Sequence, residues 1–296
     1  MIRAESLRRF FGPIRAVDGV SFEIASGETF GLLGPNGAGK STTIHMLIGA
    51  LRPDSGTVTI NDEADPTRPS VRRGLGFAPQ ALSLYDELTA EENLVFFARI
   101  HGLGGKALRA RVDWALDFAE LRDRRRDRTG GYSGGMRRRL NLVCALVHAP
   151  KVLLLDEPMA GVDPQSRNHL FERIEELQRA GMTILHTTHQ MEEAHRLCRR
   201  VAIMDHGKIL DAGTVEELIA RHGDLSVVEA TLERPPDDPA RLPGTLDGTA
   251  LRIETKRPLE EVAQLAAAGV RITSLNIHRP DLESVFLTLT GRKLRE

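Results

Sequence analysis

The chain has 296 residues, 41% of them hydrophobic, which is enough for one large folded domain or for a large and a small one. Its formal net charge is -1, so it lacks the overall positive field that draws proteins to nucleic acid. Cys144 and Cys198 are its two cysteines; their separation argues against a disulfide framework and suits a reducing cytosol. No run of about 18 apolar residues is present, so no membrane-spanning helix is predicted.

The first part of the chain has the pattern of β-strands. Apolar and polar residues alternate in "AVDGVSFEIASGETFGLL", which predicts strands joined by turns at Gly19 and Gly27. The apolar run at 29–33 predicts a buried strand that leads directly into "GPNGAGKST". The next segment, "TTIHMLIGAL", has helical spacing, with one apolar face made of Ile44, Leu47, Ile48 and Leu51.

"GPNGAGKST", residues 34–42, is a candidate phosphate-binding loop of the form G-x-x-x-x-G-K-[ST]. Backbone N–H groups between the glycines would converge on phosphate oxygens, and the following helix would point its positive end at them. Lys40 is predicted to reach the β- and γ-phosphates, the Ser41 hydroxyl to ligate Mg²⁺, and Thr42 to add a donor near the α-phosphate. The predicted nucleotide-binding residues are therefore Gly34, Pro35, Asn36, Gly37, Ala38, Gly39, Lys40, Ser41 and Thr42.

The segment from about 85 to 149 is mostly helical in pattern and carries a second glycine-rich loop. Ser133, Gly134 and Gly135 open a helix there, and exposed N–H groups with a hydroxyl would again suit an anion. The alternative is an ordinary helix capped by Ser133. If both loops bind phosphate, the second loop could serve a nucleotide held by another copy of the chain.

Polar residues at the ends of predicted strands are candidates for catalysis. Asp156 and Glu157 end the apolar run of "KVLLLDEP"; the first would hold Mg²⁺ and the second would polarise an attacking water. Gln80 ends "GLGFAPQ", where its amide would reach the metal or the water, and His189 ends "ILHTTH", where it would reach the γ-phosphate. The alternative for Asp156 and Glu157 is an ordinary loop start.

Asp163, in "AGVDPQ", has two interpretations. It fits a plain helix N-cap, and it is also a candidate for the nucleotide site. A metal site built from His186, His189 and His195 is disfavoured, because strand and loop spacing does not reproduce a helical H-E-x-x-H site.

Strands alternating with helices indicate a mainly parallel sheet covered by helices, that is, an α/β fold. The character changes near residue 222, and the Pro-, Asp- and Gly-rich segment 233–248 predicts a loop within a small α+β domain at 223–296. In its last predicted helix, Leu282, Val285, Phe286 and Leu289 form an apolar stripe that we assign to the core of that small domain.

These segments, in this order, resemble the nucleotide-binding domain of an ABC transporter over residues 1–222. "GPNGAGKST" is similar to Walker A, "GFAPQ" to the Q-loop, "YSGGM" to the signature, "KVLLLDEP" to Walker B, "GVDP" to the D-loop and "TTH" to the switch histidine. The resemblance implies a P-loop NTPase core with a β-subdomain, a helical subdomain at about 81–149, and an aromatic residue stacked on adenine. That aromatic would be Phe11, in preference to Phe10.

The resemblance also implies roles and partners. Two copies would close head to tail on two ATP, so that Ser133, Gly134 and Gly135 of one copy bind the γ-phosphate held by Lys40 and Ser41 of the other. Glu157 would be the catalytic carboxylate, and Asp163 would link the two copies. A separate integral membrane permease subunit would dock near "QALSLYDELTAEENL" and hold the chain peripherally at the cytoplasmic face of the membrane.

The chain departs from the common signature LSGGQ, because Tyr132 stands for Leu and Met136 for Gln. Val162 also stands in the D-loop where Leu is usual. "YSGGMRRRL" and the ending "HRPDLESVFLTLTGRKLRE" resemble the daunorubicin-resistance and nodulation-type exporter ATPases, a type-2 subfamily. No predicted catalytic position is lost.

The favoured function is therefore a Mg²⁺-dependent ATPase that powers export through a separate membrane subunit, with the substrate left open. A soluble ABC ATPase acting on ribosomes or nucleic acid is the first alternative, although the chain has neither a second cassette nor zinc-spaced cysteines. A P-loop kinase or GTPase and a non-hydrolysing regulatory module are further alternatives. The basic segment "LRDRRRDR" is interpreted as a solvated face, and no nucleic-acid partner is expected.

Overall fold

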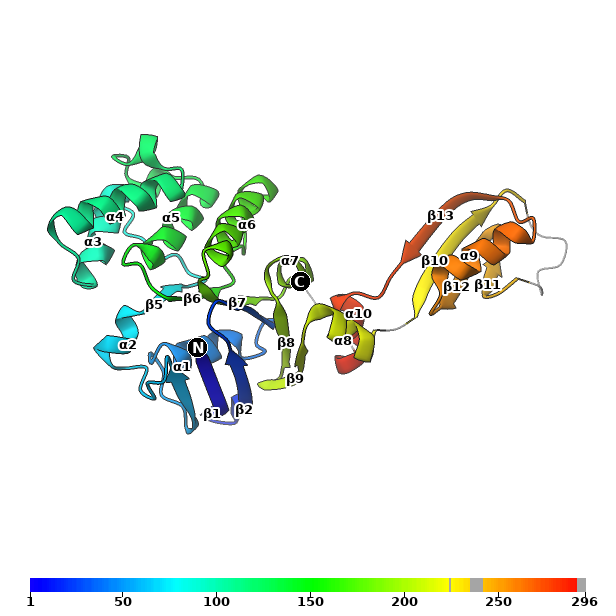
Figure 1. The fold of residues 1–296 in the computed structure, drawn as a ribbon, viewed down its shortest axis with the longest axis horizontal. Coiled ribbons are helices and arrows are strands. Elements are labelled where there is room, and N and C mark those ends of the chain that lie inside the picture. Colours follow the sequence, from blue (N-terminus) through cyan, green and yellow to red (C-terminus); the bar gives the residue numbers. More distant parts are fainter. Residues whose placement is uncertain (224, 235–241, 292–296) are drawn as a thin grey trace. The chain divides into compact units, whose positions relative to one another are not determined.

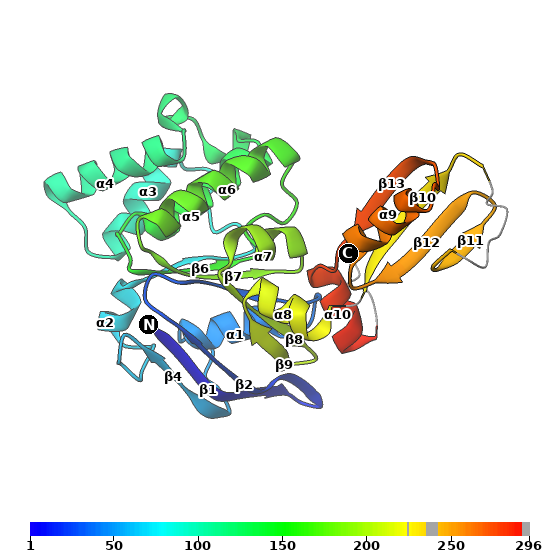
Figure 2. The same ribbon diagram turned by 45° about the vertical axis from the view of Figure 1, so that its right-hand side comes forward.

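The computed structural model describes residues 1–223, 225–234 and 242–291. The chain divides into two compact units between Val215 and Glu216, at the start of helix α8 (Val215–His222). Helix α8 goes with the second unit, where its end packs close to the start of α10 (Leu282–Thr290). A Cβ on Gly223 would lie 2.9 Å from the Cβ of Pro280, and Figures 1 and 2 show the two helices side by side.

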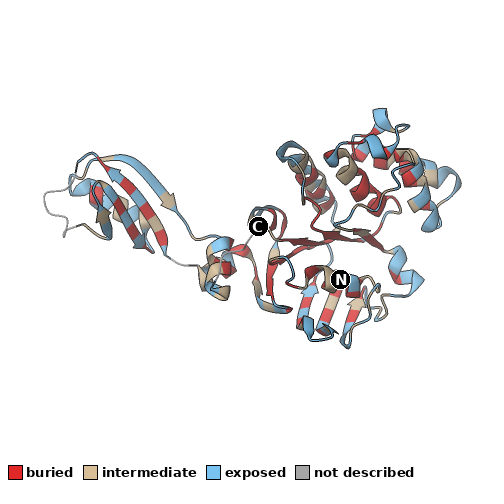
Figure 3. Cartoon of the chain, turned by 180° about the vertical axis from the view of Figure 1, so that it is seen from behind, coloured by how far each residue is buried: buried red, intermediate tan, exposed pale blue. Residues whose placement is uncertain are grey.

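A six-stranded sheet forms the centre of the first unit, with the order β5-β6-β7-β3-β8-β9. Its strands are β3 (Thr29–Leu33), β5 (Leu75–Ala78), β6 (Val152–Asp156), β7 (Thr183–Thr188), β8 (Arg200–Asp205) and β9 (Lys208–Gly213). All neighbours pair in parallel except β8 and β9. Figure 3 shows this sheet as mostly buried, and β3, β6 and β7 are buried along their whole length. The predicted α/β fold is confirmed.

A second sheet of the same unit is antiparallel, with the order β2-β1-β4. Its strands are β1 (Ile2–Phe11), β2 (Ile14–Ile24) and β4 (Ser55–Ile60). The turn predicted at Gly19 is wrong, because Gly19 lies inside β2. The pairing passes from Leu7 with Val20 to Arg8 with Asp18, so Gly19, at φ 81°, is the extra residue of a β-bulge.

Helix α1 (Lys40–Leu47) lies between the two sheets and packs against β1, β2 and β6. Its buried Ile44 and Leu47 belong to a core that both sheets share. The helix ends earlier than its apolar spacing predicts, because Gly49, at φ 67°, leaves the helical conformation. Ile48 and Leu51 still pack against the same core from partly buried positions.

The remaining helices of the first unit are α2 (Pro69–Arg73), α3 (Ala90–Ile100), α4 (Gly105–Phe118), α5 (Gly134–Leu146), α6 (Pro164–Arg179) and α7 (Met191–Leu197), with two 3₁₀ turns, η1 (Arg122–Arg124) and η2 (Thr129–Gly131). Of these helices, α2, α5 and α7 pack against the sheet. Helices α3, α4 and α5 pack on one another within the segment predicted to be a helical subdomain. Arginines of the basic segment pair with acids; Arg125, for example, contacts Glu91 and Asp113.

The second unit holds an antiparallel-paired sheet with the order β11-β12-β10-β13. Its strands are β10 (Ser226–Leu232), β11 (Thr245–Asp247), β12 (Ala250–Thr255) and β13 (Ile272–His278), and α9 (Pro258–Ala267) buries Leu265 against them. Strand β11 falls in the predicted loop 233–248, of which 235–241 lie outside the described residues. In α10, Leu282, Val285 and Phe286 of the predicted apolar stripe are buried and Leu289 is half-buried, but none of the four belongs to the described apolar cluster of the small sheet. Within the described ranges, no helix combines the length and apolar character needed to cross a membrane.

Candidate functional site: a nucleotide cleft

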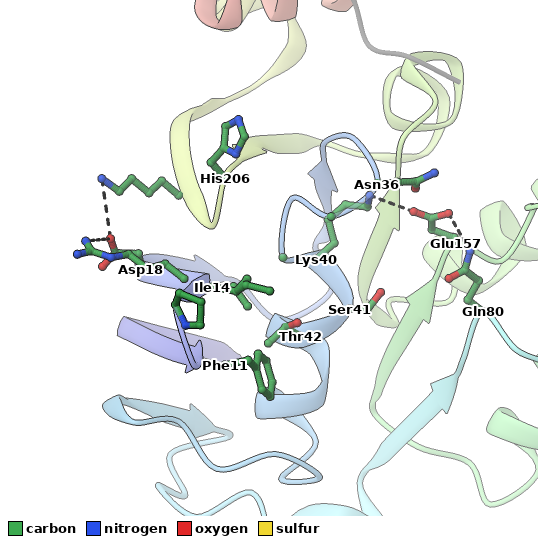
Figure 4. Close-up of a pocket in the computed structure, with 16 residues that line it drawn as sticks. Phe11, Ile14, Asp18, Asn36, Lys40, Ser41, Thr42, Gln80, Glu157 and His206 are labelled. Carbon is green, nitrogen blue, oxygen red and sulfur yellow. Dashed lines mark hydrogen bonds and ion pairs between the residues drawn. The ribbon is translucent and has the colours of Figure 1, made fainter.

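A cleft of ≈ 880 Å³ opens in the first unit beside the start of α1 (Figure 4). It is bounded by the end of β1, the start of β2, the loop before α1 and the turn between β8 and β9. Its lining residues are Phe11, Pro13, Ile14, Arg15, Ala16, Asp18, Asn36, Gly37, Gly39, Lys40, Ser41, Thr42, Gln80, Glu157, His206 and Lys208. Most of the predicted phosphate loop therefore faces one cavity.

The loop from Gly34 to Gly39 is held tightly enough that two of its positions require glycine. A Cβ on Gly34 would lie 2.1 Å from the carbonyl oxygen of Met204, and one on Gly39 would lie 2.2 Å from that of Ala16. Gly39, at φ 105°, is the N-cap of α1 and has no side-chain cap. The first N–H groups of α1 thus remain available to an anion in the cleft.

Lys40 is buried, with its ammonium held at the loop. The Nζ lies 2.7 Å from the carbonyl oxygen of Gly34, 3.0 Å from that of Pro35, and 3.0 Å from Oε1 of Glu157. Figure 4 shows the lysine reaching across the cleft toward Glu157. The Lys40 ammonium is therefore held beside the loop that the sequence predicts to bind the β- and γ-phosphates.

Glu157 brings together three residues predicted from separate segments. Its Oε1 contacts Lys40, while its Oε2 accepts a hydrogen bond from Nε2 of Gln80 at 3.3 Å and lies 3.1 Å from Nδ1 of His189. Its φ of 45° is uncommon for glutamate, and its backbone N–H bonds to the carbonyl of Thr187 at 3.1 Å. The parallel sheet produces this meeting, since β5, β6 and β7 are neighbours that end at one edge.

Asp156 lies next to the start of α1. Its Oδ1 accepts hydrogen bonds from the hydroxyls of Ser41, at 3.1 Å, and Thr187, at 2.7 Å. A carboxylate beside a hydroxyl suits a hard cation such as Mg²⁺, which keeps several waters and takes phosphate oxygens as further ligands. No group of three or more His, Cys, Asp or Glu among the described residues could hold a metal without such help. Thr187 was not predicted from the sequence.

The two candidate adenine-stacking residues differ in position. Phe11 lines the cleft and is 45% exposed, with the Arg9 guanidinium 4.9 Å from its ring centroid. Phe10 is not among the cleft-lining residues of the described chain; its ring lies 5.8 Å from the guanidinium of Arg15. The geometry therefore favours Phe11.

Ser133, in the second glycine loop, and Asp163 are both helix N-caps, of α5 and α6. The hydroxyl of Ser133 accepts from the N–H of Met136 at 3.3 Å, and Asp163 accepts from the N–H of Ser166 at 3.0 Å, which lowers the pKa of Asp163. The first turns of α5 and α6 touch, because a Cβ on Gly135 would lie 2.0 Å from Oγ of Ser166. Ser133, Gly134 and Gly135 are not among the described residues that line the cleft.

Arg138, which the sequence assigns with Arg137 and Arg139 to a solvated basic surface, connects these caps to the cleft. Its guanidinium donates to the carbonyl of Gln80 at 2.5 Å and to that of Ala160 at 2.9 Å. It therefore ties α5 to the segment that carries Gln80 and to the segment that leads to Asp163.

Seven further lining residues were also missed, and four of them carry ionisable side chains: Arg15, Asp18, His206 and Lys208. The N–H of Asp18 bonds to the carbonyl of Gly207 at 2.8 Å, which brings the β8–β9 turn against β2. Arg15 and Lys208 lie 3.4 Å and 3.9 Å from the Asp18 carboxylate. Only tertiary structure joins these positions, so no local motif in the sequence could reveal them.

Comparison with known proteins places the chain in a family. Residues 17–160 match the family model of the ABC transporter. The chain is 37% identical to the linearmycin resistance ATP-binding protein LnrL of Bacillus subtilis, with all of both chains covered. It is 41% identical to the Nod factor export ATP-binding protein I of Paraburkholderia xenovorans, over 100% of this chain and 98% of that one.

Solved structures agree. An ATP-binding subunit of an ABC transporter superposes with a TM-score of 0.68 at 31% identity, over 75% of this chain and 92% of that one. A bacterial ABC transporter cassette solved as a dimer, MJ0796, superposes with a TM-score of 0.67 at 25% identity, over 72% and 98%. The fold, the cleft and these full-length relatives together show that the chain belongs to the ABC transporter family, as an ATP-binding ABC-type ATPase.

Proposed function

We propose that this ATPase is the energy-coupling subunit of an exporter and acts on a separate membrane-spanning subunit. Two relatives that it matches over 100% and 98% of their length are named for linearmycin resistance and for Nod factor export, and both names describe ATP-binding proteins. The unusual signature "YSGGM" and the chain's ending support the same type-2 subfamily. Substrate choice would lie in the membrane subunit.

The observation that carries the proposed chemistry is the set of contacts around Glu157. This buried carboxylate, in contact with Lys40, Gln80 and His189, is placed to orient a water for in-line attack on the γ-phosphate of ATP and to take its proton. Lys40 and the N-terminus of α1 would stabilise the charge that develops on the phosphate oxygens. Gln80 and His189 would register whether the γ-phosphate is present.

Magnesium is the metal that the donor set fits. Ser41 and Asp156, with Gln80 at the edge of the cleft, would hold it, Asp156 through water. When bound, the metal would neutralise charge on the β- and γ-phosphates.

A second copy of the chain would complete the site. The start of α5 offers a capped helix N-terminus with exposed Ser133 and Gly134, outside the cleft of its own chain. In a head-to-tail pair, Ser133, Gly134 and Gly135 would contact the γ-phosphate in the partner's cleft, and Asp163 would lie at the interface. The dimeric cassette among the structural relatives supports the pairing of two copies.

The membrane subunit would dock beside α3. Tyr85 and Phe96 are exposed there, with ring centroids 4.8 Å apart, and Ile100 is 64% exposed. A groove of ≈ 240 Å³, lined by Phe97, His101 and Ala145 among others, adjoins these residues. An apolar helix from the permease would cover them and hold the chain at the cytoplasmic face of the membrane.

Co-purification tests the exporter assignment. A tagged Glu157→Gln variant, expected to stall with ATP bound, would be isolated from gently solubilised membranes beside the wild type. A multi-spanning membrane protein enriched with the variant supports the proposal. Ribosomal proteins or nucleic acid in its place would contradict the proposal and favour a soluble ABC ATPase.

A further inference from the structure

A buried ionic cluster lies behind the end of β7, on the face away from Asp156. Successive residues of β7 point to opposite faces, so Thr187 bonds to Asp156 while His186 points toward α7. There, Nε2 of His186 lies 3.0 Å from Oε2 of Glu193, and both side chains are almost fully buried. Helix α7 packs against β3 and β7, so this pair joins helix and sheet.

Glu193 also interacts with the residue after Thr187. The Thr188 side chain lowers the pKa of the Glu193 carboxylate, while the Thr188 hydroxyl accepts from the N–H of Gln190 at 2.9 Å. The backbone carbonyl of Thr188 accepts from the N–H of Gly34 at 3.2 Å, the first residue of the phosphate loop. His189 follows directly, with its ring 3.1 Å from Glu157. The position of His189 thus depends on a strand end that Glu193 fixes.

The cluster extends to the helix that begins at Asp163. The guanidinium of Arg167, on α6, lies 3.6 Å from Oε1 of Glu193, and the N–H of Arg167 donates to the carbonyl of Asp163 at 2.9 Å. Burial, the largest influence, raises the pKa of Glu193, but the hydrogen bonds and charges of His186, Thr188 and Arg167 together lower it below its ordinary value. Glu193 is therefore ionised at neutral pH, and its partners are needed to keep it so.

We propose that the His186–Glu193 pair is a positioning element for ATP hydrolysis: it fixes the end of β7 so that the His189 ring meets Glu157. The inference rests on the proposed roles of His189 and Glu157. Displacement of a catalytic group by about 1 Å can slow a reaction by as much as two orders of magnitude, so loss of the pair should slow hydrolysis without weakening nucleotide binding.

The test compares full-length variants by thermal unfolding and by steady-state ATP hydrolysis. Glu193→Gln removes the charge, and Glu28→Gln is the matched control. Glu28 is a buried carboxylate bonded to the N–H of Ala25 at 2.8 Å and lies 3.3 Å from Arg200, at the end of β3 opposite the phosphate loop. Both variants should lose similar stability. Glu193→Gln should lower kcat about tenfold with KM within about twofold, while Glu28→Gln should keep kcat.

A double variant, His186→Leu with Glu193→Leu, separates positioning from stability. It removes both members of the buried pair, and Arg167 keeps the Glu192 carboxylate as a partner at 3.1 Å, so its unfolding temperature should stay near that of the wild type. Its kcat should still be about tenfold low. His186→Gln, which keeps an N–H donor to Glu193, should recover most of the kcat lost in His186→Leu.

Wild-type kcat in the folded double variant would overturn the inference, as would a kcat loss in Glu28→Gln equal to that in Glu193→Gln. Failure of the proposed function looks different: the wild type would hydrolyse no ATP, or Glu157→Gln would hydrolyse it at the wild-type rate.

Discussion

The Nζ of Lys40 lies 3.0 Å from Oε1 of Glu157, and the two side chains are only 4% and 6% exposed. The predicted phosphate-binding lysine and the predicted catalytic acid thus neutralise each other inside the protein. A triphosphate entering the cleft would compete with this carboxylate for the lysine and would be repelled by its charge. The pair therefore couples nucleotide binding to the placement of Glu157.

Substitution at Phe11 is expected to weaken ATP binding selectively. Phe11→Ala should raise KM for ATP about tenfold with little change in kcat, because stacking of a base on an aromatic ring is worth about 1–3 kcal/mol. Phe10→Ala is the matched control: its ring is similarly exposed and outside the set that lines the cleft. Steady-state kinetics on both variants would decide the assignment, and equal KM changes would contradict it.

Because the first turns of α5 and α6 are in contact, alanine substitution at Gly134 and at Gly135 is expected to change stability unequally. Gly135→Ala should destabilise the protein by about 1–3 kcal/mol, since the new Cβ would lie 2.0 Å from Oγ of Ser166. Gly134→Ala should be tolerated, because no heavy atom lies within 4 Å of its Cβ position. Adding Ser166→Gly to Gly135→Ala should restore part of the loss in urea unfolding; no recovery would exclude the predicted clash as the cause.

The stacked pair of His101 and His148 predicts a loss of stability in mild acid. Their ring centroids are 3.6 Å apart, and Nε2 of His148 lies 2.9 Å from the carbonyl oxygen of Leu75. Burial, followed by the charge of His101, lowers the pKa of His148 from 6.5 to about 4.

Between pH 4 and pH 6.5 the unfolded chain binds a proton at His148 that the folded chain does not bind. The contribution of neutral His148 to the free energy of unfolding is therefore complete above pH 6.5 and falls as the pH drops toward 4. The expected loss is on the order of 1 kcal/mol, because the ring is partly exposed and solvent reduces the effect. His148→Gln should flatten the dependence in urea unfolding between pH 6.5 and 5. Parallel curves for the variant and the wild type would show that His148 is not responsible.

Metal dependence tests the Ser41–Asp156 pair. Chelation of Mg²⁺ should stop hydrolysis, and Ser41→Ala should raise the Mg²⁺ concentration for half-maximal rate about tenfold, because one of the few protein ligands is lost. A titration of rate against Mg²⁺ at saturating ATP provides the measurement. An unchanged midpoint in Ser41→Ala would place the metal elsewhere.

Much of this site is predictable because its chemistry is local. A few consecutive residues are enough to recognise the loop at 34–42, the acids at the end of β6 and the caps Ser133 and Asp163. The apolar run before "GPNGAGKST" likewise predicts the buried strand β3.

The contacts that the sequence does not predict join residues that are far apart along the chain. Thr187 bonds to Asp156 only because β6 and β7 are adjacent, and Arg138 reaches Gln80 across helices. Gly19 has turn chemistry but lies in a bulge, since the same positive φ serves both. The short strand β11 exists through pairing with β12, which its loop-like composition does not predict.

The most direct test of the central claim is to measure ATP hydrolysis and ATP affinity together in the wild type and in Glu157→Gln. The account predicts Mg²⁺-dependent hydrolysis in the wild type and a loss of at least about 100-fold in the variant. ATP affinity should be equal or higher in the variant, because Lys40 no longer faces a competing carboxylate. A variant that hydrolyses ATP like the wild type, or one that loses ATP binding along with hydrolysis, would contradict the assignment of Glu157 as the catalytic base.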